Sequence, residues 1–529
     1  MRRRSALATL CAGGLCALGM AGCATAHGTP AGNHAPITIA INGDPGTINP
    51  LTNVTAPGEA LVALSYDTLV FQAASGAIQG ELATKWTVTP TKAVFSIRHG
   101  ITCSDGSALT PSVIAETYTW ALNAKNHSPF LGIYITPGTK VTASNSAGTL
   151  TFVAPQPSSF FLRTLADMPI ACSAAFPNTA QLNSKTLGSG PYVLSSSTPG
   201  EQYTFTLRKG YEWGPGGVTS STSGLPKTIV AKVVPSESTA ANLLISGQLN
   251  LAAITGSDRN RLEGHGFDAL TVETNPELIF YNQAKGRPGS DLAVREALTM
   301  ALNRSELASV ATDGHGQALT NLESTDPSVC KASTPLASAL PAGNLATARR
   351  LLGTAGWTRS GSGPLAKSGK TMTLHVIYTA SEGVPLASAV QLMRQEWAAL
   401  GVTVTTQAVS ESQLTGILFS GGNWDVAWVP IVAQIPSFWQ GIVAGPTPPN
   451  GGDFSYNDNA TYNKLSAAAD GITGTASCAD WHNAEVALVR SVDVVPISAR
   501  TETIFGSHLT FSFANTEVAT TSLRESGNG

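Results

Sequence analysis

The sequence has few charged side chains and no marked excess of either sign. Asp, Glu, Lys and Arg make up 12% of its 529 residues, half of the roughly 25% typical of globular chains, and 31 basic against 34 acidic residues give a net charge of −3. The chain has too few basic side chains to bind a nucleic acid by neutralising its phosphates, so we expect no nucleic-acid partner. Hydrophobic residues at 42% exclude global disorder, and the length predicts two or three packed units.

The sequence also lacks the common motifs of catalysis and cofactor binding. Its nine histidines show neither HExxH nor another paired-ligand spacing, no GxSxG occurs, and no GxGxxG opens a helix. The turn at residues 43–46 has no Walker lysine. A Ser/His/Asp triad has no fixed order and leaves no spacing to search for. On the motifs that can be searched, we expect a protein that is not an enzyme and that carries no cofactor and no metal.

Long apolar runs are missing beyond the N-terminus. There, three arginines at residues 2–4 precede an apolar stretch, which is typical of a secretory signal at residues 1–22. No later run reaches the ~18 apolar residues of a membrane-spanning helix. The longest, residues 426–439, is interrupted by two prolines. We therefore expect the mature chain to lie outside the cytoplasm without spanning the membrane.

The end of the signal, Met20-Ala21-Gly22-Cys23, resembles the lipobox of bacterial lipoproteins. That resemblance implies that Cys23 is acylated, for example with palmitate, and becomes the new N-terminus. The alternative is an ordinary secretory signal with an incidental cysteine. Two or three acyl chains anchor a protein stably, unlike a single myristate. We expect a protein lipid-anchored to the extracytoplasmic face of the bacterial cell membrane, with residues 23–35 as a flexible linker.

Four cysteines remain after the signal and the anchor: Cys103, Cys172, Cys330 and Cys478. An even number in an oxidising compartment indicates two disulfides, for which three pairings exist. The spacings match no zinc pattern.

Helical and strand patterns alternate along the chain, which is typical of mixed α/β lobes. Alanine-rich helical patterns cover residues 111–124, 238–246, 292–307, 345–355 and 385–400. β-rich segments cover residues 37–41, 93–98, 203–208, 228–234, 371–378 and 402–408. Thr110 is placed to cap the helix that begins at Pro111, and Asn344 to cap the helix that stops at Gly356.

The order of several blocks resembles solute-binding protein family 5, the peptide- and nickel-binding proteins of ABC importers. The blocks are residues 43–50 (GDPGTINP), 82–86 (LATKW), 95–110 (FSIRHGITCSDGSALT), 188–192 (GSGPY), 246–250 (SGQLN), 291–298 with 303–304 (DLAVREAL, NR) and 424–428 (WDVAW). The resemblance implies an α/β, periplasmic-binding-protein-like fold of type II. Such a fold has two lobes, an extra subdomain inserted in lobe I, and a hinge of two crossover strands. Lobe closure buries the ligand, and only tighter binding to the closed state can drive it.

The resemblance also implies limits for these parts. We expect the core of lobe I at residues 36–60, 186–270 and 498–529, its inserted subdomain at 61–185, lobe II at 271–497, and the hinge at 271–283 and 494–499. Because each pair then falls within one lobe, we expect the disulfides Cys103–Cys172 and Cys330–Cys478.

Aromatic residues in and after the block at 424–428 are candidate ligand contacts. Trp424, Trp428 and Phe438 predict an aromatic wall against the ligand, with a core cluster of lobe II as the alternative. In peptide-binding relatives an aspartate soon after this tryptophan holds the α-ammonium of the ligand, but residues 429–437 contain no acid. Either the ammonium is held elsewhere or the ligand has no free amino terminus. Gln434 can offer a neutral hydrogen bond.

Four further ligand contacts are expected from the resemblance. Thr47 and Asn49 belong to the opening turn, which faces the cleft in relatives, with plain turn chemistry as the alternative. Tyr281 and Asn282, on the first crossover strand, can hydrogen-bond a bound chain, with a strand that fills the interdomain core as the alternative.

Together these patterns predict the substrate-binding lipoprotein of an ABC importer. We expect it to act as a monomer, to capture peptides or peptide-like solutes between its lobes, and to deliver them to the transmembrane subunits of an ABC permease. One alternative keeps the fold and changes the ligand to a saccharide, a glycolipid head group or a metallophore. Another is a non-transport scaffold or regulator of the cell envelope.

Overall fold

The computed structural model describes residues 35–132, 134–166, 168–323, 328–361, 363–514 and 516–526. The predicted signal, the predicted lipidation site Cys23 and the predicted linker up to residue 34 lie outside the described residues. Contacts divide the chain into Met1–Ala35 and Pro36–Gly529, and the fold is that of the second unit. In the described part of the chain, no helix combines the length and apolarity needed to cross a membrane.

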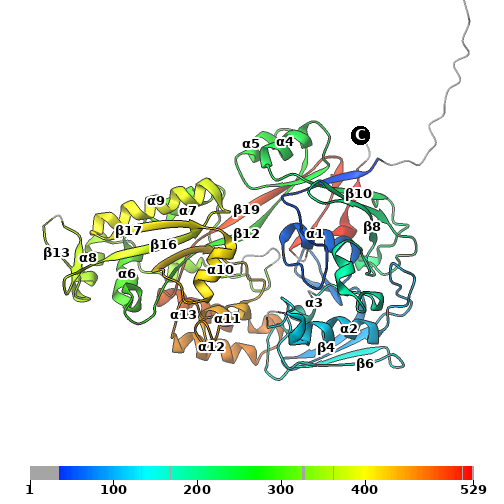
Figure 1. Cartoon of the computed structure of the whole chain (residues 1–529), viewed down its shortest axis with the longest axis horizontal. Helices are drawn as coiled ribbons and strands as arrows, with labels where there is room; N and C mark the ends of the chain where they lie inside the picture. Colours follow the sequence, from blue (N-terminus) through cyan, green and yellow to red (C-terminus); the bar gives the residue numbers. More distant parts are fainter. Residues whose placement is uncertain are drawn as a thin grey trace, which may run out of the picture. The chain divides into compact units, whose positions relative to one another are not determined.

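A ten-stranded mixed sheet runs through this unit (Figure 1). Its strands, in spatial order, are β17 (Thr403–Val409), β16 (Thr373–Thr379), β18 (Val426–Pro430), β12 (Asp268–Tyr281), β19 (Val494–Gly506), β11 (Leu251–Ile254), β1 (Ile37–Ile41), β10 (Thr228–Val233), β9 (Gln202–Leu207) and β8 (Tyr192–Thr198). Strand β1 is parallel to β10 and β11, and β16 is parallel to β17 and β18; the other neighbours are antiparallel. The alternating isoleucines of β1 are buried, as the period of a strand requires.

Two long antiparallel strands, β12 and β19, join the two halves of the sheet. The C-terminal half of β12 also pairs with β18, whereas the C-terminal half of β19 pairs with β11. The register shifts at Glu273/Pro276, between these two sets of pairs, and again at Glu277/Leu278, where β12 begins to pair with β18. The two crossover strands that the sequence predicted are therefore confirmed, and the irregular register marks where the pairing passes from one half to the other.

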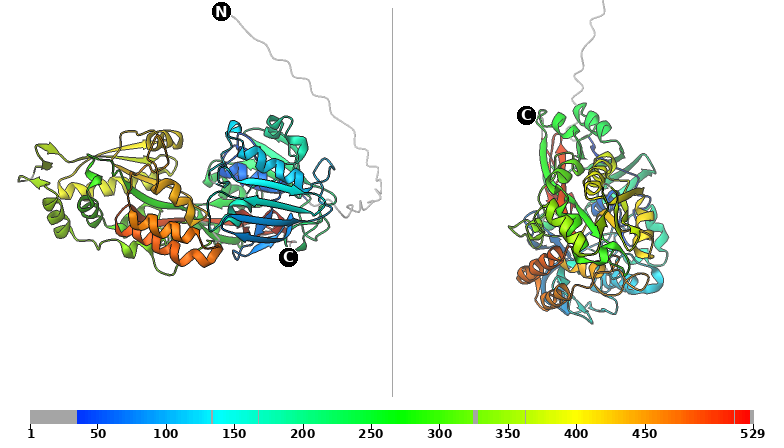
Figure 2. Two further views of the ribbon diagram at one scale, coloured as in Figure 1. Left: turned by 90° about the horizontal axis from the view of Figure 1, so that it is seen from below. Right: turned by 90° about the vertical axis from the view of Figure 1, so that its left-hand side faces the viewer.

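Each half of the sheet has hydrophobic cores of its own. Strands β16 to β18 pack with α6 (Leu292–Met300), α7 (Arg304–Ala311), α8 (Leu345–Thr354), α9 (Gly383–Leu400), α12 (Ala460–Asp470) and α13 (Cys478–Arg490) around one large core. The other half packs with α1 (Ala56–Ser65), α4 (Glu237–Ile245) and α5 (Asp258–Leu262). Figure 2 shows α12 and α13, in orange, side by side.

A second, antiparallel sheet has its own core. It contains β4 (Ala83–Thr89), β5 (Lys92–Ile97), β7 (Thr149–Val153) and β6 (Lys140–Ser144), packed with α2 (Pro111–Leu122) and α3 (Phe161–Ala166). The remaining short elements are β2 (Val70–Gln72), β3 (Ile78–Gly80), β13 (Thr358–Arg359), β14 (Leu365–Lys367), β15 (Lys370–Thr371), α10 (Glu411–Phe419), α11 (Gln440–Val443), β20 (Leu509–Thr510), β21 (Phe513–Ala514), β22 (Glu517–Val518) and β23 (Arg524–Glu525). The domain limits expected from the sequence stay a prediction.

One predicted helix and one predicted cap are wrong. The helix expected over residues 292–307 is two helices, because the side chain of Asn303 accepts a hydrogen bond from the backbone N–H of Glu306 and starts α7. Thr110 does not cap α2; its hydroxyl lies 3.1 Å from that of Ser112. Asn344 does cap α8, accepting from the backbone N–H of Thr347 at 2.9 Å.

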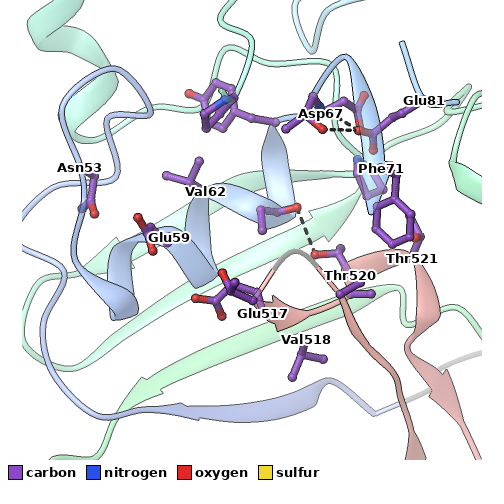
Figure 3. A pocket seen from close by; sticks show the side chains of 18 of the residues that line it. Asn53, Glu59, Val62, Asp67, Phe71, Glu81, Glu517, Val518, Thr520 and Thr521 are labelled. Carbon is purple, nitrogen blue, oxygen red and sulfur yellow. Dashed lines mark hydrogen bonds between the residues drawn. The ribbon is translucent and has the colours of Figure 1, made fainter. Parts of the chain in front are cut away.

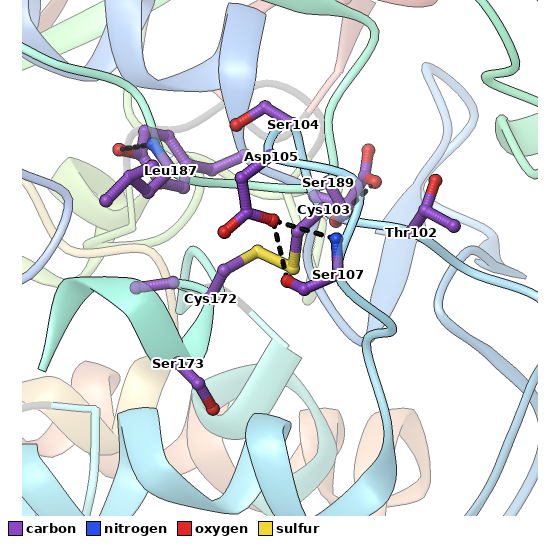
Figure 4. The surroundings of a disulfide bond; sticks show 12 residues. Thr102, Cys103, Ser104, Asp105, Ser107, Cys172, Ser173, Leu187 and Ser189 are labelled. Carbon is purple, nitrogen blue, oxygen red and sulfur yellow. Dashed lines mark hydrogen bonds between the residues drawn. A yellow bond between two sulfur atoms is a disulfide. The ribbon is translucent and has the colours of Figure 1, made fainter.

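The disulfides are Cys103–Cys172 and Cys330–Cys478, the pairing that the lobe architecture implied. Figure 4 shows that the first lies where two of the quoted blocks meet. There the backbone N–H of Ser104 donates to the carbonyl of Gly188 at 2.9 Å, and that of Cys172 to the carbonyl of Leu187 at 2.9 Å. The bridge thus stabilises the junction between the second sheet and strand β8.

Candidate functional site

A cavity lies where helix α1 meets the C-terminal segment of the chain. Its walls come from α1, from residues 66–71, and from residues 514 and 516–521. Gln434, in the segment after β18, lines it from the other half of the sheet. The cavity has a volume of about 140 Å³ and opens to solvent, so it is smaller than the ~300–1,000 Å³ of typical small-molecule sites.

Helix α1 shapes one wall of the cavity. Pro57 in its first turn starts the helix, and Leu61 and Leu64 bury its opposite side in the core. Glu59 and Val62 face the cavity (Figure 3). The hydroxyl of Thr520 donates to the carbonyl of Ala63 at 3.0 Å, which ties the C-terminal segment to the helix.

Two carboxylates, Glu59 and Glu517, line the cavity next to each other and are called the carboxylate pair (Figure 3). Burial raises the pKa of Glu59 although it sits in the first turn of a helix, where the macrodipole favours an anion. Burial, and then the charges of Glu59 and Glu502, raise the pKa of Glu517 well above its usual range. Among the described residues, neither side chain of the pair has an ion-pair or hydrogen-bond partner. The surroundings therefore disfavour the charged form of both carboxyls, and a cation bound beside them would favour it.

Two further acids, Asp67 and Glu81, also line the cavity (Figure 3). Asp67 accepts hydrogen bonds from Trp213 Nε1 and Ser189 Oγ, both at 2.7 Å, and from the Tyr211 hydroxyl at 3.1 Å. Burial raises its pKa against these donors. Burial and then the charge of Asp67 raise the pKa of Glu81 well above its usual range. With three donors on Asp67, we assign the negative charge to Asp67 and the proton to Glu81.

The rest of the wall is mostly apolar and aromatic. Phe71, Phe130 and Tyr134 line it together with Pro169 and Pro191. No lysine or arginine is among the described lining residues. The cavity can therefore take an apolar or aromatic body that carries a positive charge.

Of the eight predicted ligand contacts, Gln434 lines this cavity. Thr47 and Asn49 lie in the opening turn and bond to the chain itself. The Thr47 hydroxyl donates to Asn183 Oδ1 at 2.9 Å, and Asn49 Nδ2 to the carbonyl of Thr179 at 3.0 Å. These bonds fix the turn against the short helix Thr179–Asn183, and the ligand role of both residues stays a prediction.

Tyr281 and Asn282 are buried at the end of β12. The Tyr281 hydroxyl lies 3.0 Å from Thr299 Oγ1, and Asn282 Nδ2 donates to the carbonyl of Trp424 at 3.0 Å. Trp424 is fully buried and packs against Phe454. These contacts hold the β12–β18 pair together, and a role of the three residues in ligand binding stays a prediction.

Trp428 is also fully buried, and its indole N–H donates to Glu277 at 2.8 Å. Glu277 in turn pairs with Arg500 at 2.9 Å, and Arg500 pairs with Glu382 at 3.1 Å. Burial, against the charge of Arg500, raises the pKa of Glu277 to about 6. The network joins both crossover strands to the start of α9.

Phe438 is half-buried with its ring edge-on to Trp439, and its contact with a ligand stays a prediction. Sequence reasoning missed Glu59 and Glu517. Glu59 reads as an ordinary first-turn acid of a helix, and Glu517 stands alone in a segment without periodicity or motif. The one available signal was the missing acid in residues 429–437, which raised the question of where an ammonium is held.

Comparisons with known proteins agree with this fold. A family model described as bacterial extracellular solute-binding proteins, family 5 Middle, matches residues 77–448. Protein XP55 of Streptomyces lividans is 26% identical over 371 residues, which are 66% of this chain and 62% of that protein. The oligopeptide-binding protein AppA of Bacillus subtilis is 27% identical over 256 residues, 46% of this chain and 42% of AppA. The chain thus aligns with less than two thirds of either relative.

Solved structures extend the likeness to nearly the whole chain. A substrate-binding protein from Microbacterium hydrocarbonoxydans, in complex with 4-hydroxybenzoate hydrazide, has a TM-score of 0.74 and 26% identity and covers 93% of this chain and 100% of its own. AppA from Bacillus subtilis, in complex with a nonapeptide, has a TM-score of 0.72 and 18% identity and covers 93% and 99%. The mixed α/β fold with one large sheet is the type II fold of these binding proteins.

Proposed function

Because the chain belongs to the bacterial extracellular solute-binding proteins of family 5, we propose that it captures peptides or peptide-like solutes in the cavity and delivers them to the transmembrane subunits of an ABC importer. The observation that carries the proposal is the position of Gln434. It lines, from the half of the sheet that contains β18, a cavity whose other described walls come from single residues between Asn53 and Pro191 and from residues 514 and 516–521. A solute held there contacts both halves and favours their closed arrangement. AppA, described with a nonapeptide, supports a peptide as the ligand class.

The proposal includes the cellular setting. The chain acts as a monomer that performs no chemistry on its solute, and acyl chains on Cys23 tether it to the outer face of the cell membrane. The lipobox-like residues 20–23 support the tether.

The test is isothermal titration calorimetry of the purified chain with pools of di- to octapeptides, combined with small-angle X-ray scattering. We expect saturable binding and a smaller radius of gyration in the presence of the pool. The absence of binding by every pool would contradict peptide capture.

A second candidate keeps the fold and takes a small non-peptide solute. The observation that favours it is the Microbacterium relative, which is described with 4-hydroxybenzoate hydrazide and is 26% identical. Native mass spectrometry of the chain purified without added ligand separates the two candidates, because the mass of a co-purified solute identifies its class.

A further inference from the structure

We propose that the carboxylate pair Glu59 and Glu517 binds a positively charged amine of the captured solute. This inference rests on the proposed function and adds the charge and chemical class of the group that is recognised. It gives the cavity a specificity that the neutral segment at residues 429–437 does not supply.

The acids of the cavity have no basic counterpart. Glu59, Asp67, Glu81 and Glu517 line it, and its described lining contains no basic side chain. Asp67 has three hydrogen-bond donors, and Glu81 accepts from the backbone N–H and hydroxyl of Thr68. The carboxylate pair has no such donors among the described residues. Both side chains are half-buried, which disfavours their charged forms, and a cation in the cavity offsets that cost.

The two carboxylates lie on elements that are bonded to each other. Glu59 is on α1 and Glu517 is on β22, two elements joined by the Thr520–Ala63 hydrogen bond. The pair is therefore held on a rigid wall, and the amide of Gln434 lines the same cavity from the other half of the sheet. A cation on the pair that also contacts Gln434 bridges the two halves and stabilises their closed arrangement.

The carboxylate pair suits an amine better than a metal ion. A hard divalent cation takes six or more oxygen ligands, and no group of three or more His, Cys, Asp or Glu side chains in the described part of the chain is arranged to hold one. An ammonium has three N–H donors and no more. Two carboxylates and one amide oxygen satisfy that number, and the aromatic lining accepts the apolar part of the solute.

The test compares amine-bearing and neutralised probes by calorimetry on the full chain. The probes are a pool of di- to octapeptides, the same pool after acetylation of all amino groups, and spermidine as a non-peptide amine. The variants are Glu59→Gln, Glu517→Gln and the double variant, with Glu212→Gln as the control for loss of an exposed acid outside the cavity. Thermal melting establishes that each variant is folded.

We expect the wild type and Glu212→Gln to bind the free pool about tenfold or more tightly than the acetylated pool. We expect each single glutamine variant to reduce that ratio and the double variant to bring it near one. Equal binding of both pools by the wild type, or an unchanged ratio in the double variant, would overturn the inference and leave peptide capture standing. Binding of spermidine alone, lost in the double variant, would support the inference and overturn peptide capture. No binding of any probe would overturn both.

Discussion

At the scale of single residues, burial raises the pKa of several acidic side chains. Glu277 is an example: it is fully buried at the register shift between β12 and β19 and contacts Trp428 and Arg500. Its pKa of about 6 lies above the ordinary 4.5 because burial outweighs the attraction of Arg500. The charged form is thus disfavoured in the folded state.

This imbalance predicts how Glu277→Gln changes stability with pH. The folded wild type binds more protons at Glu277 than the unfolded chain between pH 4.5 and about 6, so its free energy of unfolding falls as the pH rises through that window. The neutral glutamine does not titrate. From pH 4.5 to 7, we expect the variant to gain about 2 kcal/mol in free energy of unfolding relative to the wild type.

Urea denaturation of both proteins at the two pH values measures this difference. A variant that loses stability relative to the wild type as the pH rises would contradict the assignment of the raised pKa. The charge of Glu382 raises the pKa of Glu277, as burial does, whereas the charge of Arg500 lowers it. The value of about 6 already contains both effects.

At the scale of elements, a close backbone contact explains why the block at residues 188–192 contains a glycine at position 190. Gly190, in the block at residues 188–192, donates its backbone N–H to the carbonyl of Ser65 at 3.0 Å. A Cβ at this position would lie 2.5 Å from the carbonyl carbon of Ser65 and 2.7 Å from the nitrogen of Tyr66. Only glycine allows strand β8 to approach the end of α1 so closely.

We therefore expect Gly190→Ala to lower the free energy of unfolding by about 3 kcal/mol, because backbone must move to relieve the overlap. The matched control is Gly353→Ala in the exposed part of α8, where a Cβ would meet nothing within 4 Å. There we expect a gain of about 0.5–1 kcal/mol from the better helix propensity of alanine. Denaturation of both variants checks the pair, and equal effects at the two positions would contradict this explanation.

Prediction from sequence succeeded best at this same scale. The strands expected at residues 37–41, 203–208 and 228–234 correspond to β1, β9 and β10 with shifts of at most one residue at an end, because local periodicity determines them. The split between α6 and α7 escaped notice, because an alanine-rich pattern continues across Asn303 and hides its cap. The cavity was not predicted from the sequence at all. Glu59 and Glu517 are 458 positions apart and meet only through tertiary packing, which leaves no mark on either segment.

At the scale of the whole molecule, two long strands connect two separately packed halves. This arrangement lets one half move against the other by changing few backbone dihedral angles. In the proposed function, this motion closes the cavity on a solute, with Gln434 on one side and the carboxylate pair on the other. Contacts of the solute with both halves then stabilise the closed arrangement.

The proposed tether gives a further prediction at this scale. We expect Cys23→Ser to release the chain from the membrane fraction into the soluble extracytoplasmic fraction, because the acylated thiol is absent. Fractionation of cells followed by immunoblotting measures the distribution. A variant that remains entirely in the membrane fraction would contradict a lipid anchor at Cys23.

The central claim is that this chain holds a solute in the cavity and does so with both halves. The most direct measurement is a crystal structure of the full chain grown with the pool of di- to octapeptides. We predict electron density for one solute within the cavity, in contact with Gln434 and with at least one member of the carboxylate pair. Density for a solute bound elsewhere, with the cavity left unfilled at saturating peptide, would contradict the account.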